Sequence, residues 1–209
     1  MHKVKFLVAV FISLLPFNFM RIFFYKKLLK YQIHNTKIGF GTIIDIDSCS
    51  IDNTQIGKFN LFTGPFTFSM HNGSIGSGNV FRCGKWVLEN PSKTIVFKHT
   101  LRVGKDVTIT NKHYFDIAGL IEIGDDSWIA GYASQFWTHG GEKTDNDIII
   151  GKNCYLGSAV RFSPGAQIAD NTLVGMGSVV TKKFKDENLM LVGVPALVKK
   201  ENFHWQKDL

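Results

Sequence analysis

Residues 148–183 read IIIGKNCYLGSAVRFSPGAQIADNTLVGMGSVVTKK and repeat one pattern every six residues. Aliphatic or aromatic side chains recur at a strict spacing of six, at Ile150, Leu156, Phe162, Ile168, Val174 and Val180. Small or β-branched residues recur at the same spacing, at Cys154, Val160, Ala166, Thr172 and Ser178. A period of six is too short for a helical repeat, but it accommodates a short strand followed by a turn.

The geometry of a strand gives each repeat two inward side chains, since residues two apart lie on the same face. The pair Thr172 and Val174 is one example. A small residue such as Gly151 or Gly175 follows each aliphatic one and lets the chain turn tightly. Three repeats close a triangular coil of about 18 residues, and coils stacked about 4.8 Å apart hydrogen-bond to each other. The sequence therefore predicts an all-β, parallel β-helix.

The same frame extends toward the N-terminus with interruptions. Its predicted inward positions are Ile38, Ile44, Ser50, Ile56, Phe62 and Phe68, then Ile75 and Phe81, then Phe97, Val103 and Ile109, then Ile117, Ile123 and Ile129. Where the frame slips, a loop should leave the coil. We predict about seven or eight coils over residues 38–183, an extruded loop at 140–149 and a C-terminal segment at 184–209.

The charge of the chain is concentrated at one end. Lys and Arg total 24 and Asp and Glu total 17 in 209 residues. Seven of the bases and none of the acids lie in residues 1–37, so the remainder holds 17 of each. A nucleic-acid-binding domain requires a basic stripe across its folded body, and this distribution argues against one. A membrane surface is the partner that a basic, apolar terminal segment favours.

The N-terminal apolar run FLVAVFISLL occupies residues 6–15. A signal peptide is not favoured, because no A-x-A-like cleavage site follows. A membrane span needs ~20 apolar residues, and Pro16, Asn18 and Arg21 interrupt this one. We predict that residues 1–37 form a helical segment in contact with the membrane surface. The alternative is that their aromatic side chains cap the end of the β-helix.

The three cysteines, Cys49, Cys83 and Cys154, have no motif spacing. An odd number without spacing argues against a disulfide framework and fits a reducing compartment. We therefore expect a cytoplasmic protein, peripheral on the inner face of the membrane. A cysteine nucleophile is not favoured, since no histidine lies close in sequence to Cys49 or Cys83.

The 148–183 stretch, followed by VGVPALVKK at residues 192–200, resembles the left-handed parallel β-helix acyltransferases that contain hexapeptide repeats. The pattern GxGSVVTK and the Gly-x-Pro-Ala ending resemble the galactoside, maltose and polysaccharide O-acetyltransferase branch. The resemblance covers residues 38–200. It implies a left-handed β-helix, a homotrimer with active sites between subunits, and transfer of acetyl from acetyl-CoA to a sugar hydroxyl of a surface polysaccharide or its lipid-linked precursor.

His139 is the predicted catalytic residue. In the frame Gln135 takes an aliphatic position, so His139 falls at a place reserved for a small inward residue, before the polar stretch GGEKTDND. An imidazole at the end of a rigid strand suits proton transfer, although it could also simply close the coil. The segment IGDDSWIAGYASQFWTH at 123–139 resembles the family segment that ends in the catalytic histidine. The resemblance implies that His139 is the general base.

Neighbours of His139 are expected to assist it. Glu142, Asp145 and Asp147 are candidates to orient the imidazole, and the residues alone do not rank them. We expect Trp137 and Glu142 to contact the sugar acceptor.

Six residues match positions that contact coenzyme A in the family: Tyr155, Ser158, Met176, Thr181, Lys182 and Lys200. The resemblance implies that Ser158 and Met176 contact the pantetheine arm, and Tyr155 stands where a tryptophan is usual. The other three match contacts around the nucleotide end, where lysines meet phosphates as point charges. Leu197 departs from the pattern, because a basic residue is expected there in the galactoside enzymes.

Other functions share parts of this pattern. A zinc-dependent carbonic anhydrase of the same fold needs a close histidine pair, and His71, His99, His113 and His139 provide no such pair, so no metal is predicted. An N-acetyltransferase acting on an amino sugar and an acyl carrier protein-dependent enzyme remain within the same class. A non-catalytic β-helix scaffold at the membrane is the alternative from another class.

Overall fold

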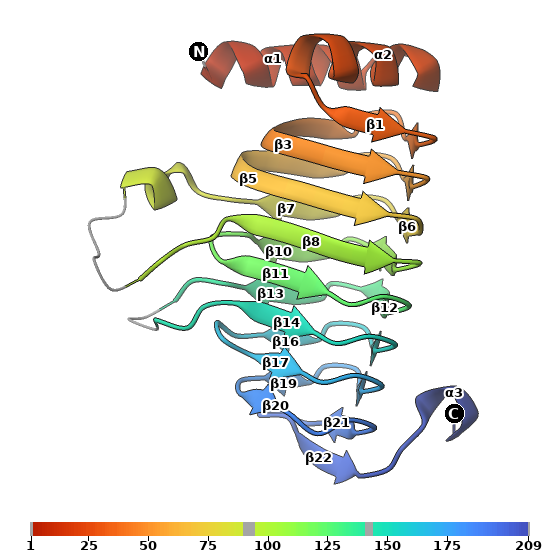
Figure 1. Cartoon of the computed structure of the whole chain (residues 1–209), viewed down its shortest axis with the longest axis vertical. Coiled ribbons are helices and arrows are strands. Elements are labelled where there is room, and N and C mark those ends of the chain that lie inside the picture. The colour runs from red at the N-terminus through yellow and green to blue at the C-terminus, as the bar shows by residue number, and fades with distance from the viewer. Residues whose placement is uncertain (1, 90–94, 141–143, 209) are drawn as a thin grey trace.

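The computed structural model describes residues 2–89, 95–140 and 144–208. Its strands are short and mostly parallel, and each pairs with strands about one coil away in the sequence. They form a left-handed parallel β-helix, as predicted. Figure 1 shows the coils stacked along the long axis, with two helices lying across the N-terminal end.

The β-helix is a triangular prism with three faces, and each complete coil adds one strand to each face. The first face contains β7 (Val80–Arg82), β10 (Tyr114–Asp116), β13 (Gln135–Trp137), β16 (Arg161–Phe162) and β19 (Val179–Val180). The second contains β1 (Gln32–His34), β8 (Thr100–Lys105), β11 (Leu120–Ile123), β14 (Ile148–Ile150), β17 (Gln167–Ile168) and β20 (Lys183–Phe184). Two longer strands, β3 (Ile43–Asp52) and β5 (Leu61–His71), continue from the first face to the second.

The third face is a separate sheet. It contains β2 (Lys37–Ile38), β4 (Gln55–Ile56), β6 (Ser74–Ile75), β9 (Thr108–Asn111), β12 (Trp128–Tyr132), β15 (Tyr155–Leu156), β18 (Leu173–Val174), β21 (Met190–Val192) and β22 (Leu197–Lys200). Only the last pair, β21 and β22, is antiparallel among the described strands. A short helix, α3 (Trp205–Asp208), ends the chain, and the Trp205 indole donates a hydrogen bond to the carbonyl of Asn153.

The core confirms the six-residue frame of residues 148–183. The six predicted aliphatic or aromatic positions are each at most 2% exposed, and the five small positions are each at most 1% exposed. A column of stacked phenylalanine rings runs through the first face, with centroids 4.3 to 5.3 Å apart; it comprises Phe62, Phe81, Phe115, Phe136 and Phe162. Burial of each of these side chains contributes ~1.5–3 kcal/mol to the stability of the fold.

The predicted frame is wrong at Ser50. In β3 the register shifts between Ile46 and Ser48, so Cys49 and Ile51 point into the core while Ser50 is half-buried. An irregularity of this kind moves every following side chain by one position.

The frame is also wrong at Gln135. The register of β12 shifts between Ile129 and Tyr132, and the extra residue puts Phe136 in the core. The small inward position then belongs to Thr138, which is fully buried. His139 therefore follows the inward position rather than occupying it.

The N-terminal segment forms the predicted helices, α1 (His2–Ser13) and α2 (Asn18–Leu29). They cap the first coil: the Arg21 guanidinium donates two hydrogen bonds to the carbonyl of Ile38, at 3.0 and 2.8 Å. The Tyr25 hydroxyl donates to the carbonyl of Thr42 at 2.9 Å and accepts from the amide of Ile44 at 3.2 Å. Among the described residues no helix is long and apolar enough to cross a membrane.

Candidate active site

His139 lies just beyond β13, where the first face turns into the second. We call this edge of the prism the His139 edge; Asp47, Cys83, His139, Pro164 and Thr181 mark it. Each of the strands before these residues belongs to the rigid ladder of the first face. The histidine is thus held at the rim of a stack that fixes the position of its backbone.

Asp116 is the partner of the catalytic candidate. It ends β10, where it pairs in register with Trp137 of the next coil, and its Oδ2 lies 2.6 Å from Nδ1 of His139. Asp116 is 4% exposed, whereas the His139 side chain is 40% exposed. A carboxylate has no proton to donate, so Nδ1 carries the hydrogen and the lone pair of Nε2 is free to accept one.

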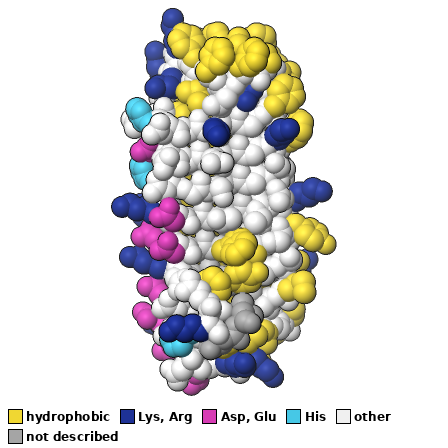
Figure 2. Space-filling model, turned by 90° about the vertical axis from the view of Figure 1, so that its right-hand side faces the viewer, with side chains coloured by type: hydrophobic (Ala, Val, Ile, Leu, Met, Phe, Trp, Pro, Cys, Tyr) yellow, Lys and Arg dark blue, Asp and Glu magenta, His cyan; other side chains and the backbone are white. Residues whose placement is uncertain are grey.

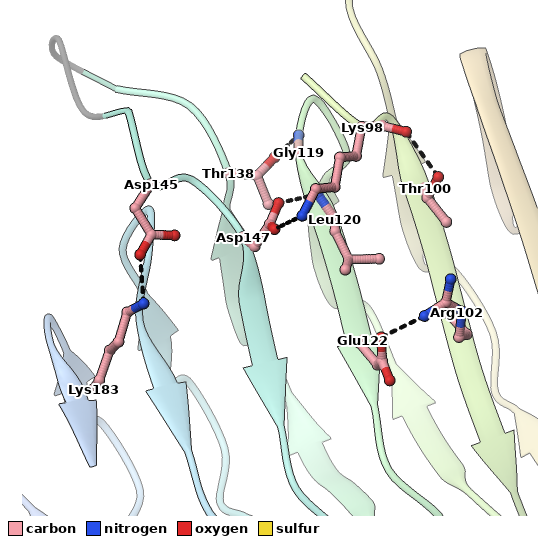
Figure 3. A network of polar contacts seen from close by, with 10 residues as sticks. All are labelled: Lys98, Thr100, Arg102, Gly119, Leu120, Glu122, Thr138, Asp145, Asp147 and Lys183. Carbon is pink, nitrogen blue, oxygen red and sulfur yellow. Dashed lines mark hydrogen bonds and ion pairs between the residues drawn. The ribbon is translucent and has the colours of Figure 1, made fainter. Parts of the chain in front are cut away.

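Thr138 holds the Asp116 carboxylate in place. Its amide donates to Oδ2 of Asp116 at 3.2 Å, and its hydroxyl donates to the Asp116 carbonyl at 2.6 Å. The same hydroxyl accepts a hydrogen bond from the amide of Gly119 at 2.8 Å, which Figure 3 shows. A buried carboxylate needs such partners to offset its lost hydration. The arrangement fixes both the tautomer and the direction of the imidazole, as the buried aspartate of a catalytic triad does.

Two indole rings flank the imidazole. The ring of Trp86, in η1 (Lys85–Glu89), lies 5.0 Å from the His139 ring, and that of Trp137 lies 6.4 Å away, measured between centroids. Trp137 is 36% exposed and also packs against Tyr114 at 4.9 Å. Trp137, predicted to contact the acceptor, therefore lies beside the catalytic candidate, and Trp86 is a neighbour that the sequence did not indicate. Glu142, the other predicted acceptor contact, lies outside the described residues.

Neither of the described loop carboxylates orients His139. Asp145 forms an ion pair with Lys183 at 2.5 Å, and Asp147 forms one with Lys98 (Figure 3). Asp147 also accepts a hydrogen bond from the amide of Leu120 at 3.0 Å. These contacts fasten the C-terminal part of the loop to the second face. Among the described residues, the carboxylate in contact with Nδ1 of His139 is that of Asp116, one coil earlier, and Glu142, the third candidate, lies outside the described residues.

Two of the predicted coenzyme A residues share the edge with His139. Thr181 and Lys182 follow β19, which is two strands beyond β13 in the ladder of the first face. They line an open cavity of about 420 Å³ together with Pro164 and Gly165. The Lys182 ammonium lies 5.1 Å from the Phe184 ring centroid. A phosphate reaching this cavity would meet an exposed positive charge.

The other predicted coenzyme A residues lie elsewhere on the same chain. Ser158 and Met176 occupy the edge where the third face turns into the first, which we call the Ser158 edge. Met176 is 77% exposed, and a Cβ on Gly177 would have no atom within 4 Å, so the backbone is bare there. One copy of the chain does not bring these residues to His139.

The remaining two lie toward the C-terminal end of the third face. The Tyr155 ring packs against Trp128 at 5.5 Å and Trp205 at 5.2 Å. The exposed side chain of Lys200, at the end of β22, lies 5.1 Å from the Phe203 ring.

Other reactive side chains in the described part of the chain are poorly suited to catalysis. The three cysteines are buried and unpaired, and burial raises the pKa of each thiol to about 12. Burial lowers the pKa of His113 to about 4, and its ring contacts Thr110 and Ser134 inside the coil. No group of three or more His, Cys, Asp or Glu among the described residues is placed to hold a metal ion.

Sequence comparison finds relatives that are named acetyltransferases. The chain is 30% identical over 124 residues to the galactoside O-acetyltransferase of Escherichia coli K12, a match that covers 59% of the chain and 55% of that protein. It is 31% identical over 130 residues to the putative colanic acid biosynthesis acetyltransferase WcaF of the same organism, covering 57% of the chain and 69% of that protein. The match thus spans about half of the first relative's length. No family model matches the chain.

Solved structures with the same fold cover most of the chain. The polySia-specific acetyltransferase NeuO superimposes with a TM-score of 0.53 at 20% identity, over 84% of this chain and 83% of that one. A hexapeptide-repeat acetyltransferase of Vibrio cholerae O1 biovar eltor, complexed with acetyl coenzyme A, gives a TM-score of 0.51 at 16% identity, over 95% and 87%. At these identities the likeness establishes the fold alone.

Proposed function

Since this chain belongs to the hexapeptide-repeat acetyltransferases, we propose that it transfers an acetyl group from acetyl-CoA to a hydroxyl group of a saccharide, with His139 as the general base. The observation that carries the proposal is the 2.6 Å contact between Asp116 and Nδ1 of His139, which leaves Nε2 without a partner among the described residues, at a partly exposed edge. The named relatives act on galactosides or belong to polysaccharide biosynthesis, which supports a sugar acceptor.

The transfer is direct. Nε2 of His139 takes the proton of the acceptor hydroxyl as the hydroxyl oxygen attacks the thioester carbonyl, and the carbon–sulfur bond then breaks. The protonated imidazole returns its proton to the departing sulfur of coenzyme A. Asp116 stays ionised, holds the ring and stabilises the imidazolium that forms. Trp86 and Trp137 flank the ring and limit the approach of water and acceptor.

The test is a transfer assay with acetyl-CoA labelled in the acetyl group and a panel of oligosaccharides. We expect label in the sugar, and we expect mild alkali to release it, because an O-acetyl ester is cleaved where an amide survives. Alkali-stable label on amino sugars would instead identify an N-acetyltransferase. Transfer only from an acylated carrier protein would identify an acyl carrier protein-dependent acyltransferase. A protein that neither binds coenzyme A nor transfers label would be a scaffold.

We infer a homotrimer, since a single chain carries the parts of the proposed coenzyme A site on two edges. His139, Thr181 and Lys182 lie on one, and Ser158 and Met176 on another. A head-to-tail contact between copies places the His139 edge of one beside the Ser158 edge of the next, and rotation closes such contacts into a ring. Each of three sites would then combine two chains.

Mixing two inactive variants tests this assembly. We expect His139→Ala and Met176→Glu to be inactive separately but to regain activity when co-expressed, because some interfaces then pair two intact edges. In a ring of three chains that contains both variants, one interface in three pairs two intact edges, so about one third of the sites are intact. The measurement is the specific activity of co-purified, doubly tagged oligomers, with reassembled His139→Ala alone as the control. Mixtures that stay inactive would assign the whole site to one chain.

The helical end of the molecule supports contact with a membrane surface, and we infer a peripheral protein on the cytoplasmic side. Apolar side chains project outward from α1, α2 and the segment between them, with 52–70% of their surfaces exposed: Val4, Leu7, Phe11, Leu14, Phe17, Phe19, Phe23 and Leu28. We call these residues the apolar end face. Figure 2 shows hydrophobic side chains gathered at this end. Single exposed apolar residues are ordinary, but a contiguous group of this kind marks an interaction surface.

Charge favours anionic lipid as the occupant of the apolar end face. Lys26, Lys27 and Lys30 are exposed beside it, and residues 1–37 contain no acid. Each such base contributes ~1 kcal/mol near an acidic membrane surface. The same helices cap the β-helix through their inner side, so the two interpretations of the N-terminal sequence describe opposite faces of one element. A saccharide precursor carried by a membrane lipid would then be within reach.

A further inference from the structure

A cavity of about 430 Å³ lies on the His139 edge toward the N-terminal end of the molecule. Helix α1, strands β3, β5 and β7 and helix η1 all contribute to its walls. Its polar lining consists of Lys5, Asp45, Asp47, Thr63, Arg82 and Lys85. Apolar side chains of Phe6, Leu61, Val80 and Leu88 complete it. A mixed lining of this kind suits a ligand with both hydroxyl groups and apolar ring faces.

The strand ladder connects this cavity to the catalytic pair. Thr63 pairs in register with Arg82, Arg82 with Asp116, and Asp116 with Trp137. Neighbouring strands are ~4.8 Å apart, so Arg82 is one strand from the carboxylate that holds His139. Helix η1 lines the cavity through Lys85 and places the next residue, Trp86, against the His139 ring. A saccharide whose hydroxyl meets Nε2 would extend along the edge into the cavity.

Arg82 is the one arginine among the described residues that line the cavity. Its guanidinium is exposed and makes no hydrogen bond or ion pair with the described residues. By contrast, Arg102 pairs with Glu122 at 2.7 Å. The Lys5 ammonium of the same cavity already donates to the carbonyl of Ile46 at 2.5 Å. The fork of donors on Arg82 is therefore available for a planar or tetrahedral anion, which it can bind through two parallel hydrogen bonds.

We propose that this cavity is the acceptor subsite and that Arg82 selects saccharides with an anionic group close to the acetylated hydroxyl. The inference rests on the acetyl transfer proposed above and adds the class of acceptor. Bases outnumber acids in the lining, because Lys5, Arg82 and Lys85 face Asp45 and Asp47. Asp45 already takes part in another interaction. The anionic group that Arg82 binds is a sugar carboxylate or a phosphate ester.

The experiment compares matched acceptors on the wild-type protein and on Arg82→Met. One acceptor is an oligosaccharide that contains a sugar carboxylate, the second is the same oligosaccharide after reduction of the carboxyl to an alcohol, and the third carries a phosphate ester on the reduced sugar. Arg161→Met is the control, since Arg161 is an exposed arginine on the same face that does not line the cavity. Arg82→Lys tests for rescue by a positive charge without the fork. Circular dichroism verifies that each variant is folded.

We expect Arg82→Met to lower kcat/KM for an anionic acceptor about 10- to 100-fold, and for the neutral acceptor less than about threefold. Arg161→Met should change neither, and Arg82→Lys should recover part of the loss. A loss of kcat/KM that is confined to the carboxylate acceptor or to the phosphate acceptor identifies the anionic group that Arg82 binds. Equal effects on charged and neutral acceptors, or no effect, would overturn the inference while acetyl transfer stands. If the wild-type protein acetylates none of the three acceptors, the result would contradict the proposed function instead.

Discussion

Replacing His139 by alanine is expected to lower kcat for acetyl transfer by on the order of 10²- to 10⁴-fold, which is the usual contribution of general-base catalysis. Without the imidazole, the only base that can accept the hydroxyl proton is water, which is a weak one. The KM for acetyl-CoA should change little, because the proposed mechanism places His139 at the acceptor hydroxyl rather than at the nucleotide. The measurement is steady-state kinetics with a purified acceptor, and unchanged kcat would remove His139 from the mechanism.

His71→Ala is the matched control for this prediction. His71 ends β5 on the second face and its side chain is exposed, so its loss removes an imidazole without touching the His139 edge. The control should retain wild-type kcat. Thermal melting of both variants separates a catalytic defect from a folding defect, and we expect the two melting temperatures to agree with that of the wild type.

Replacing four residues of the apolar end face by serine is expected to abolish binding to vesicles that contain acidic lipid. Leu7, Phe11, Phe19 and Phe23 are 65, 64, 70 and 52% exposed, so these substitutions spare the core. Burial of each such side chain in the lipid contributes ~1.5–3 kcal/mol. Even about 1 kcal/mol per residue lowers the partition coefficient roughly 10³-fold. Co-sedimentation with vesicles of acidic and of neutral lipid measures the effect.

The salt dependence of the same assay separates two contributions. High salt should release the wild-type protein only partly, because the apolar contribution survives screening of the lysine charges. Phe59→Ser is the control, since Phe59 is 63% exposed but belongs to the body of the β-helix. Wild-type protein that remains in the supernatant at low salt would contradict membrane attachment. Truncation is a poorer test, because it removes Arg21 and Tyr25, which cap the first coil.

The sequence predicts the fold best where successive coils have no insertions. From Ile150 to Val180 each inward aliphatic or aromatic side chain follows the last by six residues, so counting alone finds the core. The frame fails at Ser50 and Gln135 because the strand before each position contains an irregularity in register. Such an irregularity is not marked by any particular type of residue in the sequence. Only the three-dimensional register of neighbouring strands reveals it.

The same limit explains which part of the site the sequence misses. His139 is found through its segment, but Asp116 lies 23 residues earlier and reaches it only through parallel pairing of β10 with β13. That register depends on the lengths of the connections between the strands, and the frame slips just before Ile117. One available signal is that Asp116 stands directly before an aliphatic frame position, at the end of a strand. A carboxylate there faces the edge rather than the core.

We propose that Asp116 and His139 act as one unit in catalysis, and a double-mutant cycle on kcat measures the coupling between them. The measurement compares wild type, Asp116→Asn, His139→Ala and the double variant with the same acceptor. We expect Asp116→Asn alone to lower kcat at least about 10²-fold and the double variant to be no slower than His139→Ala, because residues acting as a unit give non-additive losses. Losses that multiply, or an Asp116→Asn variant with wild-type kcat, would contradict it.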